Sequence, residues 1–325
     1  MSDAIEMFGA AIVAAGLEPP DVIEPGRLHR FSTNGKRGDT SGWCQFFADG
    51  RAGVFGCWRS GLSSVWTARQ RELMTLAERA DMARRVKAAA AARESAKQAG
   101  WGEAADRLAA LWAQCREVPA DGTGTDPMTL YLHRRLALAP GEAISVPDVL
   151  RLHPSLPYHH EGAIVGRWPA MVAAIQGPDG ATVALHRTWL TPEGHKAPTP
   201  GPRKKLTLTA GSLVGACIRL AWPGDGATDL LGVAEGVETA LAARRLTGVP
   251  TVAACSAWAL AAWQWPSGLR RLIVFVDADR AGIEAGDQLQ QRAQATGLAV
   301  EAMRPSKAGD DWADVLVGRA AGVQP

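Results

Sequence analysis

Hydrophobic and polar positions change their spacing several times along the chain. Between Arg27 and Trp66, short aromatic and apolar segments alternate with glycines, as in RLHRF, SGWCQFFADG and RAGVFGCWRSG. Glycine turns between such segments predict a small antiparallel sheet of hairpins. From about Thr67 to Arg116, alanine, leucine and charged residues dominate, which predicts one long helix and then a second, separated near Gly100 and Gly102. Because this region is polar around its circumference, we expect it to link modules or to lie across their surface.

Two further patterns follow. After Asp121, the helical stretch MTLYLHRRLAL precedes the strand-like segments VLRLHP, PAMVAAIQGPDG, ATVALHRTWL, KKLTLTAG and ACIRLAW, and the PDG turn predicts a hairpin. After Trp222, the apolar runs LLGVAEG, VPTVAACS, LRRLIVFVDAD and GLAVEAM alternate with helical segments, which predicts a mostly parallel sheet covered by helices. We therefore expect an α/β chain, α+β overall, in four parts. These are a small β-rich module over 1–66, a helical linker over 67–118, a basic α+β part over 119–222 and a parallel-sheet domain over 223–325.

Composition limits the setting more than the activity. The 325 residues are 47% hydrophobic and 21% charged, which is enough apolar material for two or three packed domains. Five cysteines without a C-x-x-C pair fit reduced thiols better than a disulfide framework. No apolar run approaches the roughly 20 residues that span a bilayer, and MSDAIEMFGA is no secretory signal, so we expect a cytoplasmic location and no membrane contact.

The net charge is only +2, so any grip on nucleic acid must come from local clusters of basic residues. One cluster lies near the start of the chain, and another lies in the middle: Arg27, Arg30, Lys36 and Arg37, then Arg203, Lys204 and Lys205. Each cluster alone is explained equally well as a solvated face.

Three acidic residues follow the apolar runs of the last part. Glu235 comes after LLGVA and before Gly236, and Asp277 and Asp279 end the run LIVFV. Residues two apart on a strand share a face, and an α/β sheet gathers its active site at the carboxyl ends of its strands. Carboxylates brought together repel one another, and a hard divalent cation relieves that repulsion. We expect Mg²⁺, with Mn²⁺ as an alternative. A D-x-D at a strand end is otherwise a turn or a helix cap.

The order AEG–helix–strand–helix–strand–DAD–A-G–helix–strand–DDWADVL resembles the Toprim domain of primases, topoisomerases and some nucleases. The segments VAEGVETALAARRLTGVPTVAACS and VDADRAGIEAG are similar to the Toprim domain of phage and plasmid primases. The resemblance implies that Glu235 acts as general acid or base or positions the metal, and that Asp277 and Asp279 hold it. Asp311 and Asp314 match the acidic W-x-D element near the end of such domains, which implies that both bind the metal, and for Asp311 a helix cap is an equal alternative.

Further upstream, LHRTWLTPEGHKAP and PRKKLTL resemble the basic half of those primase catalytic cores. The resemblance implies that positive side chains there face the acidic site and hold template or incoming nucleotide: Arg187, Lys196, Lys204 and Arg219. Arg203 and Lys205 belong to the same patch or are solvated neighbours.

As a whole, the resemblance implies a DNA primase, that is, a DNA-directed RNA polymerase and nucleotidyltransferase in the replication of a mobile element such as a phage or plasmid. Its partners would be single-stranded DNA, nucleoside triphosphates and a separately encoded replicative helicase, since the chain has no G-x-x-x-x-G-K-[ST] loop. The N-terminal module resembles the opening of such primases and offers Arg and aromatic side chains for template contact. Alternatively, its aromatic residues form the core of a small sheet: Trp43, Phe46, Phe47, Phe55, Trp58 and Trp66. His29, Cys44 and Cys57 lack the paired spacing of a zinc site, so no zinc is expected.

Other Toprim proteins fit less well. A topoisomerase needs a tyrosine nucleophile and a large gate, whereas this short chain offers only Tyr131 and Tyr158. A Toprim nuclease with a fused ATPase would carry the phosphate-binding loop that is missing here. A stand-alone Toprim nuclease and a non-catalytic DNA-binding adaptor that recruits a helicase remain as alternatives. The intact acidic triad argues against the adaptor.

Overall fold

The computed structural model describes residues 2–33, 41–57, 62–69, 74–139, 142–222 and 229–321. The chain forms two compact units that divide between Gln98 and Ala99. Over the described ranges, the strands of both units form three sheets of four strands each. Lys36, Arg37 and Trp58 lie outside those ranges. The expected division at residues 66, 118 and 222 stays a prediction.

The first unit contains the predicted antiparallel sheet. Its helix α1 (Ser2–Ala14) precedes strands β1 (Leu28–Phe31), β2 (Gly42–Phe46), β3 (Ala52–Cys57) and β4 (Leu62–Thr67), which pair in chain order. Phe8 of α1 lies against Phe46, Phe55 and Trp66, with ring centroids 5.4–5.8 Å apart. Trp43 and Phe47 are buried in a second cluster. The described aromatic residues therefore serve the core of the sheet, as in the alternative considered above.

Helix α2 (Leu76–Ala113) runs for 38 residues without a break, so the prediction of two helices near Gly100 and Gly102 was wrong. A glycine inside a helix costs only about 1 kcal/mol relative to alanine. Both glycines are surrounded by residues of high helix propensity, and beyond them Ala104 and Leu108 are buried. This packing holds the far end of the helix in place.

The second unit begins with the predicted basic α+β part. Helix α3 (Pro127–Arg135) is followed by β5 (Leu150–His160), β6 (Ala163–Gln176), β7 (Thr182–Trp189) and β8 (Lys204–Leu206), paired antiparallel in that order. The PDG turn joins β6 to β7 as predicted, with Gly180 at φ +87°. ACIRLAW was expected to be a strand, but it makes only isolated bridges, from Cys217 to Gln176 and from Ile218 to Ala253. One neighbour of this segment is thus β6 and the other belongs to the next sheet, which rules out a continuous pairing.

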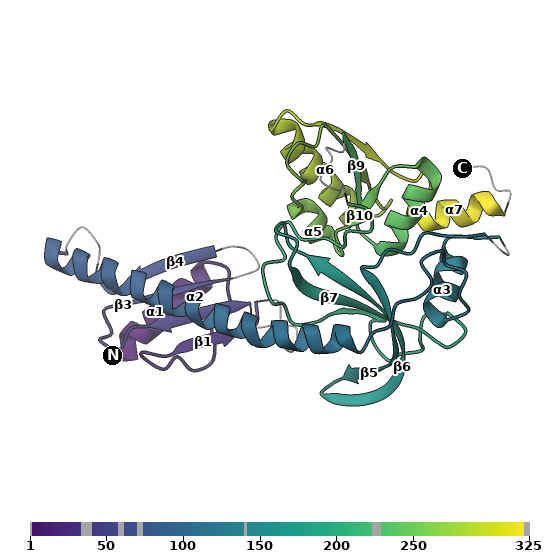
Figure 1. Ribbon diagram of the computed structural model, residues 1–325. Helices are drawn as coiled ribbons and strands as arrows, with labels where there is room; N and C mark the ends of the chain where they lie inside the picture. Colours follow the sequence, from purple (N-terminus) through teal and green to yellow (C-terminus); the bar gives the residue numbers. More distant parts are fainter. Residues whose placement is uncertain are drawn as a thin grey trace. The chain divides into compact units, whose positions relative to one another are not determined.

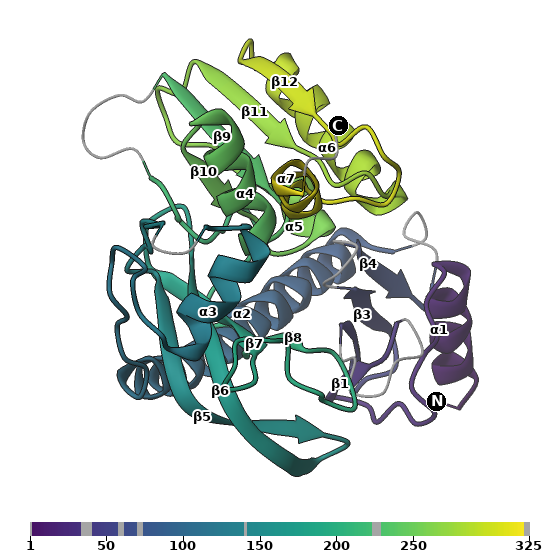
Figure 2. The same cartoon turned by 90° about the vertical axis from the view of Figure 1, so that its right-hand side faces the viewer.

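The parallel sheet is also confirmed. Strands β9 (Leu230–Ala234), β10 (Thr251–Ala253), β11 (Arg271–Phe275) and β12 (Ala299–Met303) lie in the order β10-β9-β11-β12, all parallel (Figure 2). Helices α4 (Val237–Thr247) and α7 (Trp312–Ala320) lie on one side of this sheet, and α5 (Ala257–Ala262) and α6 (Arg280–Ala295) on the other (Figure 1). Among the described helices, none has the length and apolarity needed to cross a bilayer.

A shared hydrophobic core joins the two sheets of the second unit. Met128 and Leu132 of α3 belong to the same buried cluster as Leu241 of α4, Phe275 of β11 and Trp312 of α7. The rings of Phe275 and Trp312 pack edge to face at 5.3 Å. This core fixes the basic part beside the parallel sheet, and it thereby determines which side chains meet at the carboxyl edge of that sheet.

Candidate functional site

The acidic residues leave the parallel sheet at one edge. Strands β9 and β11 are neighbours, and Ala234 pairs with Phe275, so Glu235 and Asp277 emerge at nearly the same level. Cys255, after β10, donates its amide to the Glu235 carbonyl at 2.7 Å and has φ 76°, a left-handed backbone conformation that only a few per cent of non-glycine residues adopt. Asp279 caps α6 by accepting the Gly282 amide at 2.7 Å. The cap that the D-x-D pattern suggested is thus present, and the cluster forms around it.

The three carboxylates are close enough to repel one another. Burial raises the pKa of Asp277 to about 7, and the charges of Glu235, Asp311 and Asp279 add to this effect. Burial and the charge of Asp279 raise the pKa of Glu235. Within the described residues, Asp277 Oδ1 is buried without a hydrogen-bond partner. Glu235, Asp277 and Asp279 therefore leave the sheet at one edge and their charges act on one another, while their catalytic and metal-binding roles stay predictions.

The oxygen atoms of these carboxylates are the type of ligand that a divalent cation such as Mg²⁺ prefers. In the ranges described, no group of three or more His, Cys, Asp or Glu side chains is arranged to hold a metal ion. Mg²⁺, however, is usually bound by one or two carboxylates, with water and substrate phosphate completing its shell. Asp277, with Glu235 and Asp279 nearby, offers ligands of that type. A cation would reduce the repulsion between the carboxylates, and it would give the unpaired Asp277 oxygen a partner.

Asp311 and Asp314 have structural partners. They form a capping box at the start of α7, in which each side chain accepts the other's amide, at 2.8 and 3.2 Å. Arg135 of α3 pairs with Asp311 at 2.9 Å and with Asp314 at 3.4 Å. The cap alternative is therefore realised, and a metal-binding role for either residue stays a prediction.

The four predicted basic residues separate into two groups. Lys204 pairs with Glu238 at 2.7 Å, and the pKa of Lys196 is lowered by burial and by the nearby charge of Lys204. These two lysines lie on the acidic side, since Lys204 also lowers the pKa of Glu235. Lys204 of β8 lies opposite Thr188 of β7, and both side chains point to the same face of the sheet. Arg187, next to Thr188, therefore points to the other face.

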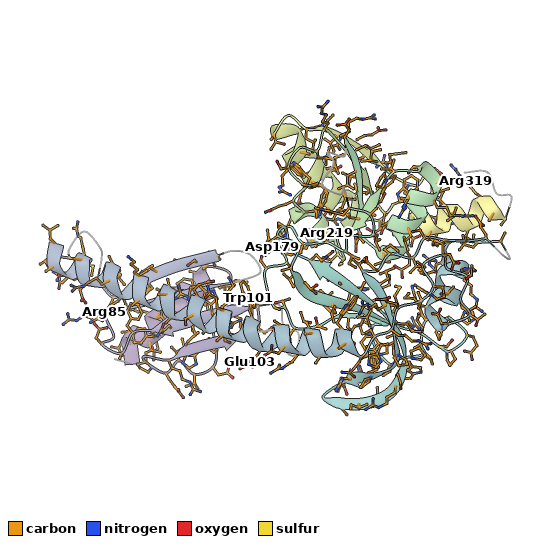
Figure 3. The ribbon with its side chains drawn as sticks, viewed as in Figure 1. Arg85, Trp101, Glu103, Asp179, Arg219 and Arg319 are labelled. Carbon is orange, nitrogen blue, oxygen red and sulfur yellow. The ribbon has the colours of Figure 1, made fainter. Side chains whose placement is uncertain are left out.

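Arg187 and Arg219 support the fold instead. Arg187 donates to the Leu206 carbonyl at 2.6 Å and lies over the Trp189 ring. Arg219 donates to the carbonyls of Gly177 and Pro178 at 2.7 and 3.1 Å, beside Asp179 at the β6–β7 turn (Figure 3). Their predicted nucleotide-binding role has no support from this placement. The neighbours Arg203 and Lys205 also donate to carbonyls, those of Ala197 and His159.

The acidic residues of the site lie in a part of the chain that matches a known protein family. Residues 230–322 match the family model described as "Toprim domain". This part of the chain is a Toprim domain. Residues 102–216 match a model described as "Domain of unknown function (DUF7146)". No curated protein sequence matches the chain.

Several solved primase structures are similar at low identity. A DNA primase domain from Pseudomonas aeruginosa is 14% identical, with 50% of this chain and 52% of that one covered and a TM-score of 0.34. The primase fragment of the bacteriophage T7 primase-helicase is 16% identical over 54% and 64%, with a TM-score of 0.36. The Aquifex aeolicus primase, with its zinc-binding and RNA polymerase domains, is 13% identical over 99% and 84%, with a TM-score of 0.39. This chain thus covers less than two thirds of the length of the first two of these primase structures.

Four residues beside the Toprim site were not predicted from the sequence: Tyr131, Arg135, His186 and Glu238. Glu238 is buried in the first turn of α4, as the one ionisable residue of the buried run VETALAA. An ionisable residue on the buried face of a helix is a signal for a polar partner elsewhere. The pattern could have singled out Glu238, but its partners are 107 and 34 residues away and no local pattern names them.

Proposed function

We propose that this chain is a DNA primase, a DNA-directed RNA polymerase that makes short primers on single-stranded DNA during phage or plasmid replication. One observation supports the proposal: in a Toprim domain, Glu235 and Asp277 follow neighbouring parallel strands at the same edge of the sheet, with Asp279 two residues further on, and the charge of Lys204 reaches Glu235. Opposed carboxylates and cations are what nucleotidyl transfer needs, because the phosphates must be both bound and neutralised. The proposed location is the cytoplasm, and the proposed helicase partner is a separate protein.

In the proposed reaction, a hydroxyl oxygen forms a bond to the α-phosphorus of a nucleoside triphosphate, and the bond to the leaving pyrophosphate breaks. Asp277 and Asp279, with Glu235, would hold Mg²⁺ or Mn²⁺, which when bound neutralises phosphate charge and orients the two reacting groups. Glu235 either accepts the hydroxyl proton or helps to hold the ion. Lys204 and Lys196 would bind the phosphate oxygens from the opposite side. Single-stranded DNA is the proposed template.

A primer-synthesis assay tests the proposal. Purified protein with single-stranded DNA, ribonucleotides and Mg²⁺ should yield short labelled oligonucleotides on a gel. Asp277→Ala should lower the yield roughly 100-fold or more, because it removes the buried carboxylate of the cluster. Asp287→Ala is the control, since Asp287 is an exposed carboxylate on α6 of the same domain. Its yield should equal that of the unaltered protein.

The alternatives predict different products. A stand-alone Toprim nuclease would shorten labelled DNA and make no primers, and Asp277→Ala would stop the shortening. A non-catalytic adaptor would bind DNA without making either product, and Asp279→Asn would change nothing. Either outcome would refute the primase proposal.

A further inference from the structure

Glu238 is buried at the junction between the Toprim domain and the basic part of the chain. It is only 3% exposed, and both of its carboxylate oxygens are engaged. The Tyr131 hydroxyl of α3 donates to Oε1 at 2.5 Å, and the Lys204 ammonium of β8 donates to Oε2 at 2.7 Å. Three elements, α3, β8 and α4, therefore meet at one carboxylate.

This carboxylate remains charged. Burial alone would raise its pKa, but the charge of Lys204 and the hydrogen bonds from Lys204 and Tyr131 outweigh burial and lower the pKa to about 2. A buried ion pair often contributes little more to stability than well-packed apolar residues of the same size. Stability alone is thus a weak reason for placing a charge here.

The partner of Glu238 faces the acidic cluster. The Lys204 side chain is 38% exposed, and an ammonium has three donors, of which Glu238 takes one. The charge of Lys204 also reaches Glu235. Lysine carries its charge on a flexible four-carbon stem, and β8 is a three-residue strand at the sheet edge, so a further contact is needed to fix the ammonium.

We propose that Glu238 is a positioning residue that fixes the Lys204 ammonium on the side of Glu235, with Tyr131 fixing Glu238 in turn. This inference rests on the proposed function, because the ammonium would then bind the triphosphate of an incoming nucleotide. Glu238 comes from the Toprim domain, whereas Lys204 and Tyr131 come from the basic part. The cation is therefore in place only when these two parts of the chain are docked on each other.

The kinetic test separates positioning from a general loss of structure. Glu238→Gln should raise the KM for ribonucleotides roughly tenfold while changing kcat less, since a charged hydrogen bond that fixes a substrate ligand is removed. Lys204→Met should show the same split. If Glu238 acts through Lys204, the double variant should be no worse than Lys204→Met alone. Additive losses would overturn the inference.

Glu142→Gln is the matched control. Glu142 forms an ion pair with Arg245 at the end of α4, which also joins the Toprim domain to the preceding part of the chain. Both side chains of that pair are about one-third exposed. A role of Glu238 in docking alone would be shared by Glu142, so Glu142→Gln should leave KM unchanged. Tyr131→Phe, which removes one hydrogen bond and keeps the ion pair, should give an intermediate KM.

A second measurement does not depend on primer synthesis. Acylation of Lys204 by an N-hydroxysuccinimide ester, followed by mass spectrometry of its peptide, reports whether the amine is held. Glu238→Gln should speed acylation of Lys204 several-fold, and Glu142→Gln should leave it unchanged. Unchanged acylation in Glu238→Gln would overturn the inference even in an active primase. Faster acylation in a protein that makes no primers would uphold the positioning and refute only the proposed function.

Discussion

His186 is a buried imidazole beside the positioning network. It is 8% exposed, and within the described part of the chain its Nδ1 has no hydrogen-bond partner. Burial and the charges of Lys204 of β8 and Arg187 of its own strand lower its pKa to about 4, although the charge of Glu238 of α4 opposes them. The folded protein therefore excludes a proton that the unfolded chain accepts near its ordinary pKa of 6.5. Stability from the neutral ring is complete above pH 6.5 and is lost as the pH falls toward 4.

This gives a testable pH dependence. Between pH 7 and pH 4.5, the free energy of unfolding should fall more in the unaltered protein than in His186→Gln, by at most about 3 kcal/mol. Urea denaturation at each pH measures the difference. His195→Gln, which replaces an exposed histidine, should keep the slope of the unaltered protein. An equally steep fall in His186→Gln would show that this ring does not carry the effect.

For single residues, the sequence predicts which side chains gather at one site better than it predicts the contacts that each side chain makes. The cluster of Glu235, Asp277 and Asp279 could be foreseen, because strand ends of a parallel sheet share one edge. The separation of Arg187 from Lys204 could not, because it depends on the register of β7 against β8. Basic residues of neighbouring strands can thus lie on opposite faces of one sheet.

Helix α6 depends on a close approach to the residue between β11 and Asp277. A Cβ added to Gly286 would lie 2.5 Å from Val276 Cγ2, closer than real carbon contacts, so the helix would have to move. Gly286→Ala should therefore destabilise the protein by about 1–3 kcal/mol. It should also reduce primer synthesis, because Asp279 is the N-cap of α6.

The control for this helix is Gly318→Ala in α7. A Cβ at Gly318 would meet nothing within 4 Å, so alanine should stabilise the protein by up to about 1 kcal/mol through helix propensity alone. Thermal unfolding of both variants checks the pair. Equal effects of the two substitutions would contradict close packing of α6 on β11.

Among the elements, long regular patterns were predicted well. The parallel sheet and its helices, and the β6–β7 hairpin, follow from hydrophobic spacing and turn residues. The continuity of α2 and the irregular path of ACIRLAW did not follow. Both depend on distant packing: Leu108 joins the core of the second unit, and Ile218 bridges to Ala253 of β10. Local helix or strand propensity predicts neither of these contacts.

For the molecule as a whole, each unit has a core of its own. Phe8 is fully buried in a cluster of the first unit, and Phe275 is fully buried in a cluster of the second. Helix α2 enters both units, with Met82 and Val86 on one core and Leu108 on the other. Between Lys97 and Glu103 it contains two glycines, Gly100 and Gly102. Each glycine lowers the helix propensity of this stretch, which makes it a weaker link between the two cores than the rest of the helix.

We therefore expect the two units to unfold in separate transitions. Phe8→Ala should lower the transition of the first unit alone, and Phe275→Ala that of the second alone, by about 3–5 kcal/mol each, because each leaves a cavity in one core. Differential scanning calorimetry of the full chain measures both transitions at once. If either substitution shifted both transitions equally, the helix would be coupling the two units strongly. Such coupling would require stabilisation of the stretch from Lys97 to Glu103 that offsets the low helix propensity of its two glycines.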